Sequence, residues 1–288
     1  MKNLRFFGSI SIVLVLVLAA TLIDFATSCA REAEGVGKIG VAVTILPIAD
    51  FIENVGGKKV DVTVMVPPGA SPHTYEPTPS QMVKISKAKM YAKVGSGVEF
   101  ELVWMDKLMK QNKKMLVIDC SAGIMKIGKD PHIWNSPVNA KKMVENICAG
   151  LIEIDPKNKD HYTENRNRYL RDLDGLDAYI RKRLGGFTHR YFMTYHPAFG
   201  YFANEYNLTQ LAIEHKGKEP TPKVIQDCID LAKRHNLSYI FVAPQFATKH
   251  AETIANSIGG KTVFIDPLPR LYIPNMRSVA ASLSLEME

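Results

Sequence analysis

The chain has 288 residues, of which 46% are hydrophobic and 23% are charged, enough for one large domain or two compact ones. Its formal charge is +7, but the excess is spread along the chain, and the basic stretches lack the aromatic platforms of a nucleic-acid site. These features exclude nucleic acid as an expected partner.

Residues 1–28 are typical of a signal peptide, with a basic start followed by the apolar run GSISIVLVLVLAATLI. The next stretch, FATSCA, resembles a bacterial lipobox in which Cys29 is lipidated, although Ala26 stands where leucine is usual. Cleavage after Ser28 without lipidation, or retention of the run as an uncleaved anchor, are the alternatives. All three place the rest of the protein outside the cytoplasmic membrane. We expect it to be anchored at the outer face by a lipid or an N-terminal anchor, in the periplasm or on the cell surface, with residues 29–37 as a polar tether.

From residue 38, β-like runs alternate with amphipathic stretches, and several of the helices open with a capping residue or proline. Strands alternating with helices imply parallel βαβ units, here an N-terminal lobe over 38–154. The expected strands are 38–46, 59–66, 89–95 and 114–119, and the expected helices are 47–57, 78–88, 99–111 and 136–154.

The alternation is interrupted by one long charged segment, 155–186, which we expect to be a helix capped by Asp155 with Pro156 as its first residue. About 29 helical residues would span roughly 43 Å, more than one small lobe needs. We therefore interpret the segment as a rigid spine that joins two lobes. Apolar residues spaced by three, four or seven form its packed stripe: Tyr162, Tyr169, Leu173, Leu176, Ile180 and Leu184.

The alternation then resumes and predicts a C-terminal α/β lobe over 187–288. Its expected strands are 190–195, 208–214, 237–244 and 261–266, and its expected helices are 198–206, 221–236, 248–260 and 273–285. The predicted fold is thus α/β: two similar lobes, each a mainly parallel four-stranded sheet flanked by helices, joined by the spine helix. The remaining cysteines, Cys120, Cys148 and Cys228, include no C-x-x-C pair and are expected to be buried thiols, although one pair could bridge.

Four residues that can bind a metal follow strands in both halves: His73, His132, His196 and Asp266. In open α/β sheets, ligands bind beyond the carboxyl ends of the strands. Three imidazoles and one carboxylate suit tetrahedral zinc, and a proline near each residue stiffens its loop. The sequence therefore predicts a metal site between the lobes. Glu214 and His215 follow a comparable strand and are weaker candidates for contacts there.

The segments around these residues resemble the metal-specific solute-binding proteins of zinc and manganese ABC transporters. The matching motifs are SPHTYEPTPSQ, DPHIWNSPVNA, YHPAFGYFANEYNL and IDPL, and the resemblance runs from about residue 38 to the C-terminus. It implies that His73, His132, His196 and Asp266 are the metal ligands. Manganese-type members usually carry Glu at the position of His196, so imidazole there favours zinc.

This sequence departs from the family pattern at three places. Asn135 and Ser136 stand where Leu and Asp are usual, and Ala243 stands where the family often has Glu. The His-rich acidic loop between the first and second ligands is missing. None of these departures removes a ligand.

The resemblance implies a monomeric receptor that captures Zn²⁺, with Mn²⁺ possible, delivers it to a membrane permease and catalyses no reaction. The chain has no G-x-x-x-x-G-K-[ST] loop, so the ATPase must be a separate cytoplasmic polypeptide. The alternatives are a manganese- or iron-binding member of the family, a secreted zinc hydrolase, and a metal-dependent adhesin. The predicted four-ligand shell and the lack of H-E-x-x-H argue against the hydrolase.

Overall fold

Two four-stranded parallel sheets form the framework of this computed structural model, which describes residues 37–214 and 219–287. The chain divides into two units, Met1–Lys38 and Ile39–Glu288, and both sheets belong to the second. The expected signal segment, the tether up to residue 36, Cys29 and His215 lie outside the described residues. Within the described ranges, no helix has the length and apolar character needed to cross a membrane.

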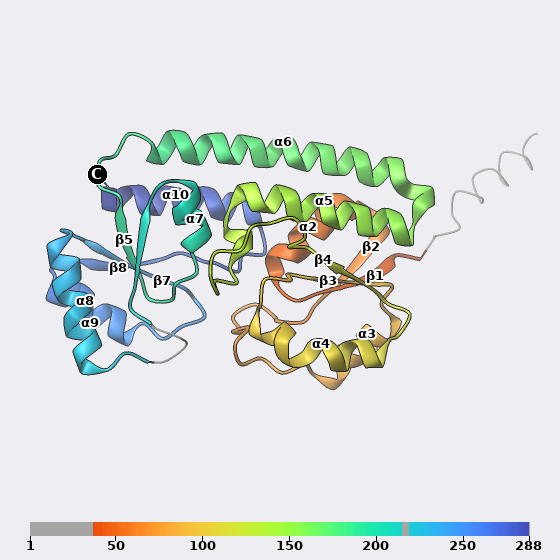
Figure 1. Ribbon diagram of the computed structural model, residues 1–288, viewed down its shortest axis with the longest axis horizontal. Coiled ribbons are helices and arrows are strands. Elements are labelled where there is room, and N and C mark those ends of the chain that lie inside the picture. Colours follow the sequence, from red (N-terminus) through yellow and green to blue (C-terminus); the bar gives the residue numbers. More distant parts are fainter. Residues whose placement is uncertain (1–36, 215–218, 288) are drawn as a thin grey trace, which may run out of the picture. The chain divides into compact units, whose positions relative to one another are not determined.

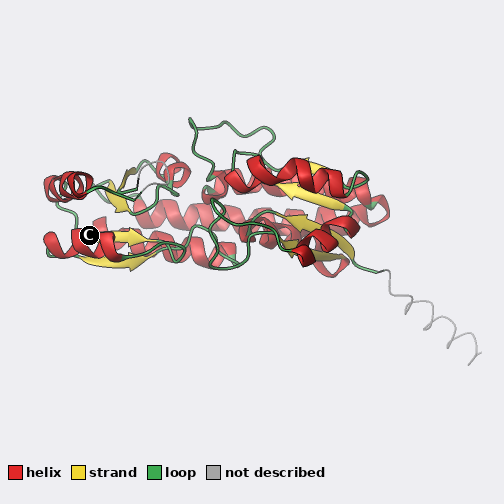
Figure 2. Cartoon of the chain, turned by 90° about the horizontal axis from the view of Figure 1, so that it is seen from below, coloured by secondary structure: helices red, strands yellow, loops and turns green. Residues whose placement is uncertain are grey.

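The first sheet has the strand order β2-β1-β3-β4, and each neighbouring pair is parallel. Helices lie on both of its faces (Figures 1 and 2), and we call this sheet with its helices the N-terminal lobe. Its elements are β1 (Ile39–Val43), α2 (Leu46–Gly56), β2 (Val60–Val64), α3 (Pro79–Lys87), β3 (Met90–Lys93), α4 (Glu99–Gln111), β4 (Leu116–Asp119) and α5 (Pro137–Ile154).

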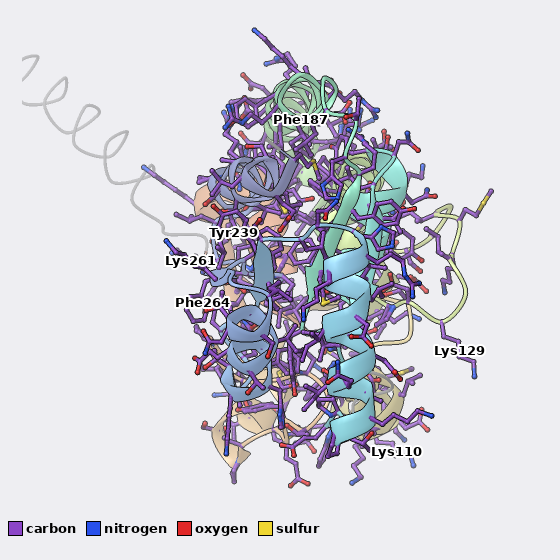
Figure 3. All side chains as sticks on the ribbon, turned by 90° about the vertical axis from the view of Figure 1, so that its left-hand side faces the viewer. Lys110, Lys129, Phe187, Tyr239, Lys261 and Phe264 are labelled. Atoms are coloured by element: carbon purple, nitrogen blue, oxygen red, sulfur yellow. The ribbon has the colours of Figure 1, made fainter. Side chains whose placement is uncertain are left out.

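The second sheet repeats this topology as β6-β5-β7-β8, again all parallel, and with its helices it forms the C-terminal lobe. Tyr239 pairs with Lys261 where β7 and β8 begin (Figure 3). The two lobes confirm the predicted α/β architecture. The elements are β5 (Tyr191–Thr194), α7 (Gly200–Glu205), β6 (Thr209–Ala212), α8 (Pro222–Arg234), β7 (Tyr239–Val242), α9 (Lys249–Ser257), β8 (Lys261–Phe264) and α10 (Tyr272–Met287).

In each sheet the first strand of the lobe, β1 or β5, lies inside the strand order. The chain therefore runs to one side of that strand and then crosses to the other, which makes a topological switch point. In open α/β sheets, the loops at the carboxyl side of such a point diverge and hold ligands. The switch points lie between β1 and β3 and between β5 and β7.

Helix α6 (Lys159–Leu184) is the expected spine, 26 residues long, or roughly 39 Å at 1.5 Å per residue. It packs against α2, α5 and α10 and runs past both sheets (Figure 1). Its start differs from the expectation, because residues Pro156–Asn158 form a 3₁₀ turn and Asp155 makes no capping hydrogen bond to the backbone. Asp155 Oδ2 instead accepts hydrogen bonds from Asn158 Nδ2 at 2.6 Å and from the Tyr162 hydroxyl at 2.7 Å.

The apolar stripe predicted for the spine is buried along its whole length. Each of its six side chains is at most 4% exposed, and burying a side chain of this size contributes ~1.5–3 kcal/mol. These side chains join one core cluster that also includes Phe51 of α2, Phe192 of β5 and Tyr272 of α10. The two lobes therefore share a continuous core, and a second, smaller cluster around Met193 and Ile254 lies in the C-terminal lobe.

The cysteines of the described residues are free thiols, as predicted. Cys120, Cys148 and Cys228 are buried and unbridged. Burial also raises the pKa of the Cys120 and Cys148 thiols, so both are protonated at neutral pH. They act as small apolar side chains and not as metal ligands.

Candidate metal centre

The loop that carries His73 is tied to the end of β2 by Gln81. Gln81 closes a capping box with Thr78 at the start of α3, which satisfies two backbone N–H groups. Its Nε2 also donates hydrogen bonds to the carbonyl oxygens of Val64 and Met65, at 3.1 and 2.7 Å. The loop between β2 and α3 is therefore held at both ends, which fixes where His73 projects.

His132 and His196 are positioned by equally short-range interactions. His132 precedes the 3₁₀ turn Ile133–Asn135, and its backbone N–H donates to Asp130 Oδ1 at 2.9 Å. His196 follows β5 after one residue, and its carbonyl accepts from the backbone N–H of Ala198 at 2.8 Å. Both residues are largely buried, with 7% and 8% of their surface exposed.

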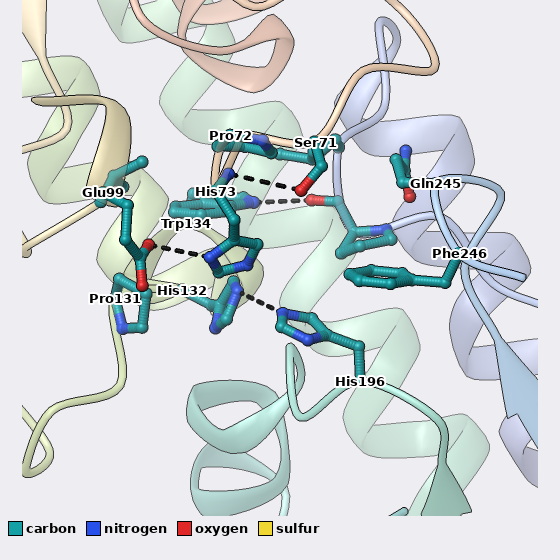
Figure 4. A pocket seen from close by; sticks show the side chains of 13 residues that line it. Ser71, Pro72, His73, Glu99, Pro131, His132, Trp134, His196, Gln245 and Phe246 are labelled. Atoms are coloured by element: carbon teal, nitrogen blue, oxygen red, sulfur yellow. Dashed lines mark hydrogen bonds and ion pairs between the residues drawn. The ribbon is translucent and has the colours of Figure 1, made fainter. Parts of the chain in front are cut away.

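The structure brings these three histidines together in one pocket (Figure 4). One ring nitrogen from each of them can be chosen so that all three lie within 4.8 Å of one another. The Nε2 atoms of His132 and His196 are 3.2 Å apart, and the His196 ring lies 5.1 Å from both other rings. In the part of the chain that the structure describes, this is the group of side chains arranged to hold a metal ion.

Each histidine turns its Nδ1 toward a carboxylate. The distances are 3.0 Å from His73 to Glu99, 2.8 Å from His132 to Asp130 and 2.9 Å from His196 to Glu214. A carboxylate accepts a hydrogen bond from Nδ1–H, so each ring is held in the Nδ1–H tautomer and leaves its Nε2 lone pair for a metal. The arrangement matches the carboxylate–histidine–metal triads of zinc sites.

The protonation state of His132 also favours metal binding. Burial lowers the pKa of His132, and the hydrogen bond and negative charge of Asp130 offset only part of this shift. The imidazole is therefore neutral at physiological pH, which is the form that binds metal.

Aromatic side chains wall the pocket. Phe246 stacks on the His196 ring at 4.5 Å, and Trp134 meets the His132 ring edge-on at 5.3 Å. Trp134 also joins the lobes, because its indole N–H donates to the carbonyl of Pro267 at 2.6 Å and its own carbonyl accepts from the Tyr272 hydroxyl. These contacts limit the rotation of the rings.

Asp266 is not brought into the three-histidine group. Its Oδ1 accepts hydrogen bonds from Gln245 Nε2 at 3.0 Å and from the backbone N–H of Leu268 at 2.9 Å. Gln245, Pro267 and Leu268 line the pocket, whereas Asp266 does not. Asp266 as a fourth ligand stays a prediction.

Several residues around the site were not identified from the sequence. Glu99 has a recognisable position, because it opens a helix just after β3 at the same edge of the sheet. Asp130 stands two residues before His132, and Gln245 follows β7 at the switch point of the second sheet. Glu214, a weaker candidate from the sequence, proves to be the partner of His196.

The family model described as "Zinc-uptake complex component A periplasmic" matches residues 41–284. The high-affinity zinc uptake system protein ZnuA of Bacillus subtilis is 30% identical over 276 residues, covering 88% of this chain and 86% of the relative. The zinc-binding lipoprotein AdcA of Streptococcus pneumoniae is 27% identical over 279 residues, and the chain spans 55% of its length. A crystal structure of ZnuA is 37% identical with a TM-score of 0.85, covering 88% of this chain and all of that one.

Proposed function

Because the chain belongs to the family of periplasmic zinc-uptake complex components, we propose that it captures zinc outside the cytoplasmic membrane and delivers it to an ABC permease. The observation that supports this most strongly is the meeting of three imidazoles from both lobes within 4.8 Å. The metal is cargo in this account, so the site must bind it reversibly.

The proposed ligands are the Nε2 atoms of His73, His132 and His196. Zinc binds imidazole nitrogen at about 2.0–2.1 Å in a tetrahedral arrangement, whereas manganese prefers oxygen ligands. A site with three imidazoles therefore favours zinc. The sequence predicts Asp266, in the C-terminal lobe, as the fourth ligand through a carboxylate oxygen.

Removal of one histidine tests this ligand set. His196→Ala should weaken zinc binding by more than about 100-fold, beyond what the loss of an outer-shell partner causes. His250→Ala removes a histidine from α9 in the same lobe and is the matched control, with unchanged affinity expected. Calorimetric titration of both variants decides the matter, since unchanged affinity in His196→Ala would rule out this residue as a ligand.

Delivery to a permease requires a position at the outer face of the membrane, which the N-terminal segment would provide. We infer that residues 1–28 direct export and that Cys29 is lipidated, so that the protein works as a tethered monomer beside its permease, with the ATPase on a separate cytoplasmic chain. Mass spectrometry of the mature N-terminus of the wild type and of Cys29→Ser tests this inference. Loss of the lipid and release from the membrane in the variant are expected, and an N-terminus upstream of Cys29 in the wild type would contradict it.

A secreted zinc hydrolase is the second candidate, and one observation favours it. Three histidines with a fourth position open to water are also the arrangement of catalytic zinc. The zinc-loaded protein should show no turnover of an activated ester above a His196→Ala background. Turnover that disappears in this variant would contradict the receptor function.

A further inference from the structure

Lysines lie together at the amino edge of the first sheet, where its parallel strands begin. They occupy the segments that lead into β2, β3 and β4 and the start of α6. Seven of them are exposed and one is half-buried, and none forms an ion pair with another described residue. We call this surface the lysine edge, and it consists of Lys58, Lys59, Lys87, Lys89, Lys113, Lys114, Lys157 and Lys159.

Hydrogen bonds hold the segments before β3 and β4 together. Asn112 Nδ2, just after α4, donates to the carbonyl of Ala88 at 2.8 Å. The backbone N–H of Leu116 donates to the carbonyl of Lys89 at 2.9 Å, and the N–H of Lys89 donates to the carbonyl of Gly40 in β1 at 2.8 Å. The lysines before β3 and β4 therefore lie on neighbouring strands, about 4.7–4.9 Å apart across the sheet.

The start of α6 joins the same edge through the loop before β2. The Nε2 atom of His161 lies 3.3 Å from the Gly56 carbonyl oxygen, and Asn165 Nδ2 donates to the carbonyl of Val55 at 3.0 Å. From Val60 onward, β2 pairs with β1. The turn between α5 and α6 and the start of β1 lie at the end of the N-terminal lobe that is away from the C-terminal lobe (Figure 1). The lysine edge is therefore one continuous surface at this end of the lobe.

Acidic side chains do not neutralise the lysine edge. In and beside the same segments, Asp61, Glu153 and Asp160 are exposed, and they are fewer than the lysines. Asp155 is buried and accepts hydrogen bonds from side chains of its own turn and of α6. The surface therefore carries a net positive charge.

The fold itself does not require these lysines. The second sheet has the same topology, but the residues just before β6, β7 and β8 are uncharged. Those residues are Leu208, Ser238 and Gly260. Arg190, before β5, is occupied by hydrogen bonds from its guanidinium group to backbone carbonyls.

Helix dipoles do not explain the pattern either. A dipole favours cations at the end of a helix, as at Lys87 in α3, but disfavours them at the start, where Lys159 begins α6. Clustered charges of one sign also destabilise a compact state. A charge pattern that opposes stability in this way indicates that the surface binds an anionic partner.

The length of chain before the sheet indicates which anionic partner is within reach. Residues 29–36 connect Cys29, the proposed lipidation site, to Gly37, two residues before β1. A stretch of eight residues spans at most about 26–29 Å. An anchor at Cys29, or an uncleaved segment before it, therefore keeps the amino edge of the sheet close to phospholipid headgroups.

We propose that the lysine edge binds the anionic phospholipid headgroups of the membrane to which the chain is anchored. This inference rests on the anchoring in the proposed function and adds an orientation to it. Each lysine near an anionic membrane surface strengthens binding roughly fivefold, so four of them favour the bound orientation on the order of several hundredfold.

This orientation separates the metal pocket from the lipid charges. The strands run from the lysine edge toward the loops that carry the three histidines, and β1 alone has five residues, or roughly 13 Å. This length exceeds the Debye length of about 8 Å at physiological ionic strength. The headgroups should therefore not compete with the histidines for zinc while the receptor rests on the membrane.

Lysine footprinting of the anchored wild type tests the proposal. The full chain, purified with its anchor, is reconstituted into vesicles of phosphatidylcholine alone or mixed with phosphatidylglycerol, and mass spectrometry measures the acylation of each lysine. On the mixed vesicles the lysine edge should react at least about fivefold more slowly than on the neutral ones, and salt at about 1 M should abolish the difference. Exposed lysines of the C-terminal lobe are the internal control, with unchanged reactivity expected: Lys223, Lys233 and Lys249.

Two multiple variants test the role of charge. The first replaces Lys87, Lys89, Lys113 and Lys114 with glutamine and should abolish the protection of Lys58 and Lys159. The matched control carries four glutamines in the C-terminal lobe and should keep the protection. Its replaced residues are Lys223, Lys233, Lys249 and Lys261. Thermal melts verify that both variants are folded.

Equal reactivity of the lysine edge on the two kinds of vesicle would overturn the proposal, as would equal loss of protection in both multiple variants. Flotation of the same samples separates this inference from the anchoring on which it rests. Protein that floats with neutral vesicles but has an unprotected lysine edge on anionic ones would contradict only the contact with lipid. Protein that does not float with neutral vesicles would contradict the anchoring.

Discussion

Replacing Glu214 by alanine removes the carboxylate that holds the Nδ1–H tautomer of His196. Glu214 lies 2.9 Å from Nδ1, and its side chain is 5% exposed, so its charge is little screened by solvent. The corresponding side chains of Asp130 and Glu99 are 19% and 47% exposed. The effect on zinc affinity should therefore decrease in the order Glu214, Asp130, Glu99.

The expected magnitudes follow from this burial. Loss of an outer-shell partner of a metal-bound histidine weakens binding about 10–100-fold, or ~1.4–2.7 kcal/mol, and we expect Glu214→Ala in this range. Glu99 is nearly half exposed, and exposed ion pairs contribute ~0.2–1 kcal/mol, so Glu99→Ala should weaken binding by no more than about fivefold. Glu214→Gln keeps an acceptor for Nδ1–H and should lie between Glu214→Ala and the wild type.

Chelator competition at constant pH and ionic strength measures all of these variants, and thermal melts of the apo proteins correct for lost stability. The reasoning would be refuted if Glu99→Ala weakened zinc binding as much as Glu214→Ala, because burial would then not determine the strength of these contacts. Unchanged affinity in Glu214→Ala would refute the tautomer argument itself.

Further predictions concern a glycine beside the site, a glycine in the spine and a buried carboxyl group. A Cβ on Gly200 would lie 2.3 Å from Asp130 Oδ2. Gly200→Ala should therefore displace this carboxylate from His132 and weaken zinc binding about tenfold in the same competition assay. Unchanged affinity would show that the contact between Asp130 and His132 does not affect zinc binding. A Cβ on Gly175, within α6, would meet no atom within 4 Å. Gly175→Ala should therefore raise the free energy of unfolding, measured by urea denaturation, by ~0.8–1 kcal/mol without altering zinc affinity. A loss of stability in this variant would contradict the prediction. Burial raises the pKa of Glu101 above that of an unfolded glutamate, ~4.3. The unfolded chain therefore loses this proton at lower pH than the folded chain does, and the Glu101 contribution to stability decreases as pH rises from about 4 through the raised pKa. Urea melts of the wild type and Glu101→Gln should show a pH-dependent difference in this window, and a constant difference would contradict it.

The alternation of strands and helices was predictable because local signals and tertiary structure agree in this chain. Thr78, Ser136 and Thr221 were each followed by proline in the sequence, and each caps its helix with a side-chain hydrogen bond to the backbone. The inner strands β1, β3, β5 and β7 are short, mostly buried apolar runs, as expected inside a parallel sheet, whereas the edge strands β2, β4, β6 and β8 are only partly buried. When local sequence signals and tertiary packing favour the same structure, the fold can be predicted from the sequence.

Asp155 shows where local reasoning failed. Asp followed by Pro is a strong signal for a helix start, and the 3₁₀ turn does begin at Pro156. The carboxylate is nevertheless used by the side chains of Asn158 and Tyr162, and the α-helix starts only at Lys159. These partners lie three and seven residues further along the chain, so the competing contacts are local in sequence but are not part of the capping signal.

The candidate site was predictable in part for a similar reason. The topology places the carboxyl ends of parallel strands at one edge, so residues just beyond several strands meet, as His73, His132 and His196 do. A sequence shows where a side chain leaves its strand but not which partner it finds there. Asp266 forms a local turn with the Leu268 N–H, as aspartate before proline often does, and a contact with Gln245 that lies 21 residues away. The roles of Glu99 and Gln245 likewise depend on contacts between loops.

X-ray absorption at the zinc edge of the purified, zinc-loaded protein tests the central claim most directly. Three imidazole nitrogens at about 2.0–2.1 Å, with the multiple-scattering pattern of the rings, are predicted for the wild type, and two are predicted for His196→Ala if any zinc remains bound. A zinc ion with fewer than three imidazole ligands in the wild type, or with sulfur in its shell, would contradict the three-histidine site.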